Sequence, residues 1–365
     1  MTYAERMRSK AFFGIASLTA LGISVACGGS DDDVSKTVAD AGGTSSTTPG
    51  QPPDPPSGAA ATTSTDARTF AVTSFTLGDL DRSGNVNPDA WKSLGYDIDR
   101  QATNTDGDLA KTCQRTGSLA VVQDGENGID NSFGHNIVTL INNVSGSASK
   151  NLTQAAIDGR FTLLVQVKGL TDDAAQTNTG LSGTVFFATP FGGDPDSGIR
   201  PTFTPADDWP YRNDTQVDLP NAYVVKSEFV NGAGTGEFPL ALALAGTTVL
   251  LTVHHGTISF THDPANQALV KGTIAGVVDT QKLVDSMDAL ASRFTPPICP
   301  GTALSIIKAA IASSSDILSD GTQDPAKPCD GISIGIGFEA KRVGNPTKPV
   351  PPSAESQSNA CDAGP

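Results

Sequence analysis

The stretch 238–278, "FPLALALAGTTVLLTVHHGTISFTHDPANQALVKGTIAGVV", decides the fold. It holds four short apolar runs, and each run ends in Gly, in "DP" or in a polar pair. Short runs of this kind, bounded by turn residues, are typical of β-strands. No helical segment lies between them to make a parallel crossover, so the stretch predicts antiparallel hairpins.

Strand and helix patterns continue on both sides of this stretch. Further runs rich in β-branched and aromatic residues lie at 160–170, 181–190, 221–230 and 331–343. In the last run, "GISIGIGFEAKRV", the alternating glycines predict a close approach of another segment. Apolar residues at helical spacing predict helices at 131–143, 281–293 and 302–318. We therefore predict a mainly β protein, a single antiparallel β-sandwich-like domain over 69–343 with a few flanking helices.

The N-terminus has the pattern of an export signal. "MTYAERMRSK" carries three basic residues and one acid, and an apolar run, "AFFGIASLTALGISVA", follows at 11–26. This run is shorter than the roughly 20 residues that cross a bilayer core. A basic head, a short apolar body and a small residue before the break are typical of a signal peptide, predicted at 1–26.

The break itself reads "SVAC" and ends at Cys27. It resembles the lipobox of bacterial lipoproteins, although Ser24 stands where that family usually has Leu. The resemblance implies that Cys27 becomes the lipidated first residue of the mature protein. Because Gly28 is not the Asp that retains family members at the inner membrane, it also implies localisation to the outer membrane. The alternative is an ordinary signal peptide that leaves Cys27 as a plain thiol.

Composition separates a tether and a tail from the domain. Residues 27–68 are rich in Gly, Ser, Thr, Pro, Ala and Asp, and such a segment cannot bury enough apolar surface to fold. It is predicted to be a disordered tether, and 344–365 a Pro-rich C-terminal tail. The net charge is −15, and loss of a signal with three basic residues and one acid brings it near −17. This charge excludes nucleic acid as a partner and leaves the lipid as the contact with the membrane.

Four cysteines besides Cys27 predict disulfide bonds in an exported protein. Four cysteines permit three pairings. Cys299 with Cys329 is favoured because the two bracket one compact helical segment, and Cys113 then takes Cys361 by elimination. The alternative is that one pair stays reduced.

The stretch 78–91, "GDLDRSGNVNPDAW", has two interpretations. Over nine positions it resembles the calcium loop of EF-hand and dockerin modules, with Asp79, Asp81, Ser83, Asn85 and Asn87 as ligands. The twelfth position, where that family needs a bidentate acid, is alanine. The other interpretation is a turn in which Asn87 caps a short helix, and it is favoured.

One further observation bears on the calcium interpretation. Asp97 and Asp99 are candidates for the ligand that the loop lacks.

A second resemblance covers the region around this loop. The blocks "AWKSLGYDID" and "QDGENGIDNSFGHN" are similar to blocks shared by a set of uncharacterised bacterial lipoproteins. That resemblance covers 78–143 and implies an extracytoplasmic domain with no known activity.

Residues for catalysis are sparse. The chain has no G-x-S-x-G, S-x-x-K with K-T-G, or H-E-x-x-H pattern. A hairpin at "HHGTISFTHD" would bring one of two adjacent histidines to His262 and Asp263, although scattered surface histidines are favoured. The long loop 186–215 combines aromatic rings and carboxylates, as a glycan site does, with Asp207, Asp208, Trp209 and Tyr211 as candidate ligand residues. The other interpretation, which is favoured, is that its rings fold back over the sheet.

Together these patterns predict a lipid-anchored cell-envelope protein of the outer membrane with a binding or structural role. Its partners would be the membrane, reached through the N-terminal lipid, and a glycan or envelope-protein ligand. Calcium is the one cofactor considered. A non-enzymatic role is favoured because no stretch supplies a nucleophile, a base and an orienting group together. The alternative is a lipid-anchored hydrolase that acts on glycan.

Overall fold

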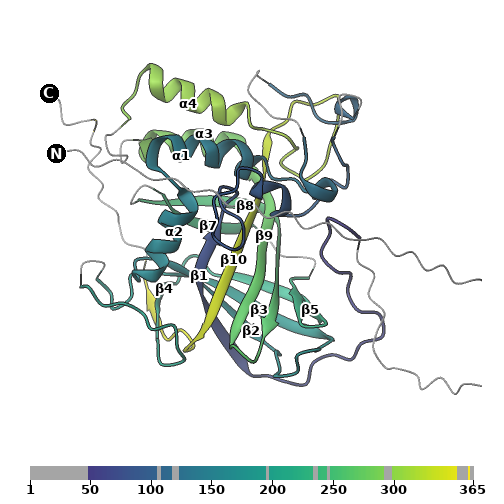
Figure 1. The fold of residues 1–365 in the computed structure, drawn as a ribbon, viewed down its shortest axis with the longest axis vertical. Helices are drawn as coiled ribbons and strands as arrows, with labels where there is room; N and C mark the ends of the chain where they lie inside the picture. The colour runs from purple at the N-terminus through teal and green to yellow at the C-terminus, as the bar shows by residue number, and fades with distance from the viewer. Residues whose placement is uncertain are drawn as a thin grey trace, which may run out of the picture. The chain divides into compact units, whose positions relative to one another are not determined.

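The structure, a computed structural model, describes residues 48–104, 108–116, 123–194, 197–232, 237–244, 247–291, 298–351 and 361. The predicted signal peptide, Cys27 and the first part of the predicted tether lie outside the described residues. The described part holds eleven strands in one sheet (Figure 1). The strands are β1 Ala67–Thr76, β2 Thr162–Lys168, β3 Asn178–Ala188, β4 Pro210–Arg212, β5 Val217–Val225, β6 Glu228–Val230, β7 Phe238–Leu244, β8 Thr247–Asp263, β9 Ala268–Asp279, β10 Gly331–Val343 and β11 Lys348–Val350.

Eight of the described strands close into a barrel. The hydrogen-bonded order is β3, β2, β1, β10, β9, β8, β6 and β5, and β5 pairs again with β3. All pairs around this ring are antiparallel. The mainly β, antiparallel prediction is confirmed, but the sandwich-like arrangement is wrong. Register shifts in β1, β3, β8 and β10 increase the coiling of the long strands, and β3 therefore meets β5.

Alternate residues of the strands fill the barrel. Side chains from all eight strands join one buried apolar cluster, which includes Phe70, Leu163, Val185, Leu219, Phe229, Phe260, Ile274 and Ile336. Phe229 and Phe260 stack in this cluster with ring centroids 4.6 Å apart. The interior is therefore a packed core, as in other small barrels.

The predicted hairpin after His254 is a bulge instead. β8 runs unbroken through His255 and Gly256, and its register with β9 shifts between His254 and Thr257. His255 takes a left-handed conformation (φ 54°), which absorbs the extra residue. The run predicted as one strand at 221–230 is divided by a turn between β5 and β6.

The described helices are α1 Val138–Ser145, α2 Ala148–Ile157, α3 Thr280–Ala291 and α4 Thr302–Ala312. Short helical turns lie at Ala90–Ser93, Leu109–Lys111, Glu126–Gly128 and Phe133–Ile137. The helices predicted at 131–143, 281–293 and 302–318 are thus present, whereas α2 was not predicted. α4 ends earlier than predicted because the hydroxyls of Ser313 and Ser314 bond back to the carbonyls of Ala309 and Ala310. Figure 1 shows α1, α3 and α4 beyond one end of the long strands, and α2 packs on β1 and β7.

An irregular segment, the described residues of 77–135, packs on the outer face of β10; we call it the cover. A Cβ at Gly335 of β10 would overlap the Leu94 carbonyl of the cover, so the close approach predicted from the alternating glycines is confirmed. Asn131 joins the two layers. Its amide nitrogen donates to the carbonyls of Leu94 (2.9 Å) and Gly335 (3.1 Å), and its amide oxygen accepts from the Gly335 N–H (2.9 Å).

Part of the predicted tether lies on the domain. The Asp97 N–H donates to the Gly50 carbonyl (2.8 Å), and the Tyr223 hydroxyl donates to the Pro53 carbonyl (2.7 Å). Further along, Thr62 bonds to the Thr179 carbonyl (2.8 Å) at the edge of β3. Ordered structure therefore begins before residue 69, because backbone bonds hold this segment where its apolar content is too low to do so.

The cysteines pair differently from the prediction. The disulfides are Cys113–Cys329 and Cys299–Cys361, so the favoured pairing is wrong, although all four cysteines are bonded. Gln114 makes a short parallel bridge with the 327–329 segment, with the Cys329 N–H donating to the Gln114 carbonyl (2.9 Å). This backbone pairing, which nearness in sequence does not reveal, sets Cys329 beside Cys113.

Candidate functional site

The predicted calcium loop folds as a hairpin turn. Leu80 and Val86 form an antiparallel bridge, and the Asp81 N–H donates to the Asn85 carbonyl (2.9 Å). The Asp81 carboxylate accepts from the backbone N–H groups of Ser83 (2.9 Å) and Asn85 (3.0 Å). Asn87 accepts from the Asp89 N–H (2.9 Å) ahead of the helical turn at 90–93. These contacts form a turn, as that interpretation predicts, but the residue that precedes the helical turn as its cap is Asp89, with no side-chain cap bond, rather than Asn87.

Asp79 points away from the turn and toward α2. Its carboxylate accepts from the hydroxyl of Ser147 (2.5 Å), the residue that caps α2, and from the hydroxyl of Ser149. The structure thus gives Asp79 a structural partner at the positive end of a helix. A calcium ion bound in the turn would have to compete with these hydroxyls for the Asp79 oxygens.

Asp97 and Asp99 instead form a group with Asp130. Ligand oxygens of these three carboxylates lie within 4.8 Å of one another. Asp130 is only 3% exposed, and its Oδ2 accepts from the Ile98 N–H (2.7 Å). Two more acids, Asp124 and Asp316, are close enough to raise the pKa of Asp130 through charge repulsion. We call these five residues the acidic cluster.

Burial dominates the electrostatics of the acidic cluster. It raises the pKa of Asp124 to about 7 and that of the almost fully buried Asp316 to about 6. The pKa of Asp130 is raised well above its usual range, first by burial and then by the neighbouring acids. Burial also raises the pKa values of Asp97 and Asp99. Arg115 supplies the nearby positive charge that acts against these shifts at Asp99, Asp124 and Asp316.

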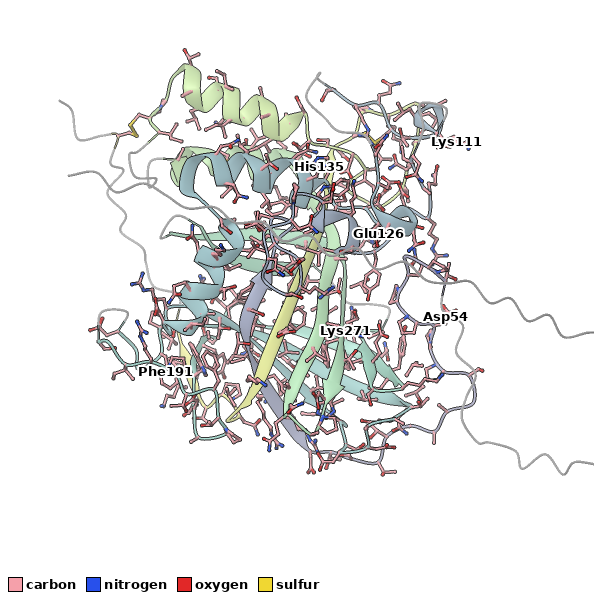
Figure 2. All side chains as sticks on the ribbon, viewed as in Figure 1. Asp54, Lys111, Glu126, His135, Phe191 and Lys271 are labelled. Carbon is pink, nitrogen blue, oxygen red and sulfur yellow. A yellow bond between two sulfur atoms is a disulfide. The ribbon has the colours of Figure 1, made fainter. Side chains whose placement is uncertain are left out.

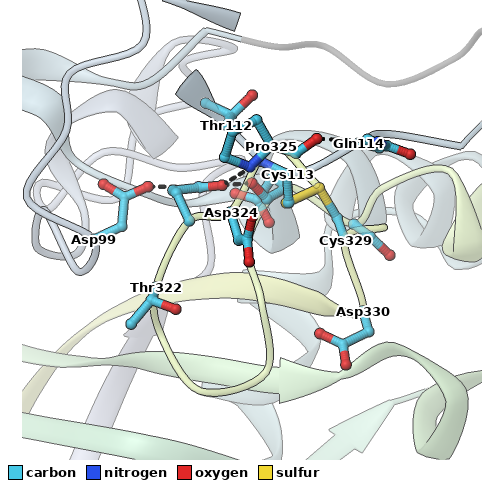
Figure 3. The surroundings of a disulfide bond; sticks show 12 residues. Asp99, Thr112, Cys113, Gln114, Thr322, Asp324, Pro325, Cys329 and Asp330 are labelled. Atoms are coloured by element: carbon cyan, nitrogen blue, oxygen red, sulfur yellow. Dashed lines mark hydrogen bonds between the residues drawn. A yellow bond between two sulfur atoms is a disulfide. The ribbon is translucent and has the colours of Figure 1, made fainter. Parts of the chain in front are cut away.

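The acidic cluster is built from segments far apart in the sequence. Gln323 connects them: its side chain accepts from the Cys113 N–H (2.8 Å) and donates to Asp99 Oδ2 (2.6 Å) and to the Asp316 carbonyl (3.0 Å) (Figure 3). Asp316 in turn accepts from the N–H (2.9 Å) and hydroxyl (2.5 Å) of Ser333 on β10. The Cys113–Cys329 disulfide therefore fixes the same two segments that carry the acids.

The donor set fits a hard divalent cation. Carboxylate oxygens are the ligands that calcium prefers, and it takes six to eight oxygens. Asp97 Oδ1 is buried and has no hydrogen-bond partner among the described residues. Three converging carboxylates that repel one another, with one oxygen unpaired, provide part of such a coordination shell. Backbone carbonyls or water would have to complete it.

The aromatic loop folds back onto the barrel. Trp209 is fully buried, packs against Phe191 (ring centroids 4.8 Å apart), and lies on the outer face of the β1 and β2 wall. Asp207 accepts three bonds from Thr202 and Phe203 of its own loop. Asp208 accepts from Thr347 (2.7 Å) near β11. Among the four candidate ligand residues, Tyr211 has a half-buried ring. No hydrogen bond of its hydroxyl is described.

The histidines do not assemble into a site. His262 is 3% exposed, packs edge-on against Phe70 and has its pKa lowered to about 4 by burial. His254 lies near Glu237 (3.6 Å). His135, which is labelled in Figure 2, stacks on Trp91 in the cover. The unbroken β8 strand removes the hairpin that was to bring His254 or His255 to His262.

Sequence reasoning named Asp97 and Asp99 but missed the rest of the acidic cluster. Asp130 is only the residue before the helix predicted at 131–143, and Asp316 lies within the helix predicted at 302–318. One sequence feature marks Asp130: it lies in a turn-rich segment directly before an amphipathic helix. Asp316 carries no such signal, because a fold-back after α4 brings it to the cover.

No family model, curated protein or solved structure matches this chain. The resemblances to lipoproteins and to calcium loops therefore stay predictions. Among the described residues, no helix combines the length and the apolar character needed to cross a membrane.

Proposed function

We propose that this protein is a lipid-anchored component of the outer membrane with a non-enzymatic binding or structural role. The observation that carries the proposal is the "SVAC" break after a short apolar signal, with Cys27 as the lipidated residue. The acidic composition supports it, because it leaves the lipid as the attachment to the membrane. The ligand is a glycan or another envelope protein.

The described contacts favour binding over hydrolysis. A glycosidase needs two carboxyl groups that face each other about 5–10 Å apart across a cleft. Asp207 is 6% exposed and bonded within its loop, and Asp208 is bonded to Thr347. These bonds support a structural role for Asp207 and Asp208 rather than a catalytic one.

We further propose that the domain binds calcium at Asp97, Asp99 and Asp130 rather than in the 79–87 turn. The specific observation is the convergence of the three carboxylates within 4.8 Å. A cation there would offset the repulsion among buried acids and would stabilise the cover on the barrel. Extracellular calcium modules bind with dissociation constants of about 0.1–1 mM, and we expect this range.

Anchoring is tested by metabolic labelling with a palmitate analogue in cells that express the wild-type chain or Cys27→Ser. Label in the wild-type protein only, with a mature N-terminal peptide beginning at Cys27, is the expected result. An unlabelled wild-type protein in the soluble fraction would contradict the proposal. Ser30→Ala, which lies just after Cys27 and keeps the signal and all five cysteines intact, serves as the matched control.

A further inference from the structure

A polar trough runs along the outer face of β3. Its floor is formed by the short side chains of Ser182 and Thr184, which face away from the core beside inward-facing Leu181 and Val185. On one side Ser182 and Thr184 pair with Lys168 and Gln166 of β2, and on the other Thr184 pairs with Asp218 of β5. Long side chains therefore flank short ones, and the resulting depression has a volume of about 260 Å³.

The trough offers unused hydrogen-bonding groups. Thr184 donates to Asp218 Oδ1 (3.1 Å), and Gln166 donates to Thr69 (3.1 Å). Among the described residues, no hydrogen bond or ion pair engages the Lys168 ammonium or the Ser182 hydroxyl. The side-chain amide oxygen of Gln166 and the second Asp218 oxygen also have no described partner. The trough thus presents donors and acceptors together, with one charge of each sign.

We propose that this trough binds a saccharide. Sugar hydroxyls both donate and accept, so they match a lining that mixes an ammonium, a carboxylate, an amide and two hydroxyls. Because Lys168 and Asp218 balance each other, the lining carries no net charge in a strongly acidic protein, which suits a neutral ligand. The volume lies below the about 300–1,000 Å³ of pockets for drug-sized ligands, as expected for a single sugar ring in an open groove.

An aromatic pair lies farther along the outer face of β3, outside the residues that line the trough. Two residues beyond Thr184 on the same face, Phe186 packs edge-on against Tyr211 (ring centroids 4.9 Å apart). Tyr211 is half-buried and pairs with the end of β3 at Ala188. A sugar ring carries apolar C–H groups on its face, so an aromatic side chain beside polar groups suits it. The trough thereby gives a location to the glycan ligand of the proposed function, on which this inference rests.

The test uses the full mature protein, purified from membranes in a detergent that contains no sugar. Calorimetric titration with maltotetraose, chitotetraose and mannotetraose compares the wild type with two trough variants. Ser182→Ile fills the floor with a residue that favours strands, and Lys168→Ala removes the unpaired ammonium. Lys341→Ala, an exposed lysine on β10, is the matched control. Circular dichroism spectra check that each variant is folded.

Saturable binding of one tetrasaccharide, at least fivefold weaker in Ser182→Ile and in Lys168→Ala but unchanged in Lys341→Ala, is the expected result. Absence of binding to all three sugars overturns the inference, as does binding that both trough variants retain. Lipidation is scored separately on the same preparation. A lipidated protein without sugar binding would therefore reject the trough alone, whereas sugar binding without a lipid would reject the anchoring proposal alone.

Discussion

The barrel wall and the cover are built in different ways. In the wall, residues alternate between a packed interior and an outer face, and strand pairing satisfies the backbone. The cover has almost no regular structure, and single side chains hold it in place: Asn131 bonds to Leu94 and Gly335, and Gln323 bonds to Cys113 and Asp99. The wall therefore serves as scaffold, and the buried acids concentrate in the cover and in the segment that folds back onto it.

Removal of the Cys113–Cys329 disulfide should have the largest effect on this arrangement. The bond joins residues 216 positions apart and holds the cover to the segment after α4. Replacing both cysteines with alanine should lower the free energy of unfolding by about 3–5 kcal/mol. Replacing Cys299 and Cys361, only 62 positions apart, should cost about 1 kcal/mol less.

Urea unfolding of the two double variants measures this difference, and peptide mapping without reduction identifies the bonded pairs. A peptide that links Cys299 to Cys329 would contradict the described pairing. A larger loss from the Cys299 and Cys361 variant would contradict the role of the first bond in holding the cover.

The wall and the cover should respond to pH with opposite signs. In the cover, the folded-state pKa of Asp124 is raised to about 7, so the folded state binds more protons than the unfolded state between about pH 4 and 7. Its contribution to stability is therefore present at low pH and is lost as pH rises through 7. In the wall, the pKa of His262 is lowered to about 4, so its contribution is lost as pH falls from about 6.5 toward 4.

Single substitutions separate the two contributions. In EDTA, Asp124→Asn should add about 2 kcal/mol at pH 8 relative to wild type and about a quarter of that at pH 4.5, after allowance for its partial exposure. His262→Gln should reduce the loss of stability between pH 6.5 and 4. Urea unfolding across pH 4–8 measures both profiles. Parallel profiles for the wild type and Asp124→Asn would show that this carboxyl is not held protonated by the fold.

The junction between the cover and α2 should give a smaller effect. Asp79→Ala removes the acceptor for the Ser147 and Ser149 hydroxyls and should cost about 1–1.5 kcal/mol. Asp81→Ala, in the exposed part of the same turn, should cost about 0.5 kcal/mol. Thermal unfolding of the two variants makes the comparison. Equal losses would mean that Asp79 supports only the turn.

The contrast between wall and cover also explains what could be predicted. Short runs such as 160–170 and 268–278, rich in β-branched residues and bounded by turn residues, predict strands. Barrel closure depends on bulges such as the one at His255. No sequence pattern predicts the left-handed conformation of this residue. The sequence therefore predicts the strands and leaves their closure open.

The acidic cluster was harder to predict than the strands. Asp97 and Asp99 stand in a visibly acidic stretch, but Asp316 reaches them only through a fold-back fixed by Gln323 and by a disulfide between distant cysteines. Such long-range contacts carry no periodic signal. Trp209, by contrast, is buried against the wall, as the favoured fold-back interpretation predicts.

The central claim, that the cover rather than the 79–87 turn binds calcium, is tested most directly by calcium-dependent stability. At a calcium concentration about fivefold above the dissociation constant, the wild type should gain about 1 kcal/mol over the protein in EDTA. Asp79→Ala should gain as much. Asp130→Asn, which keeps an acceptor for the Ile98 N–H, should be at least as stable as wild type in EDTA and should gain nothing from calcium. A gain that Asp79→Ala loses and Asp130→Asn keeps would contradict the account.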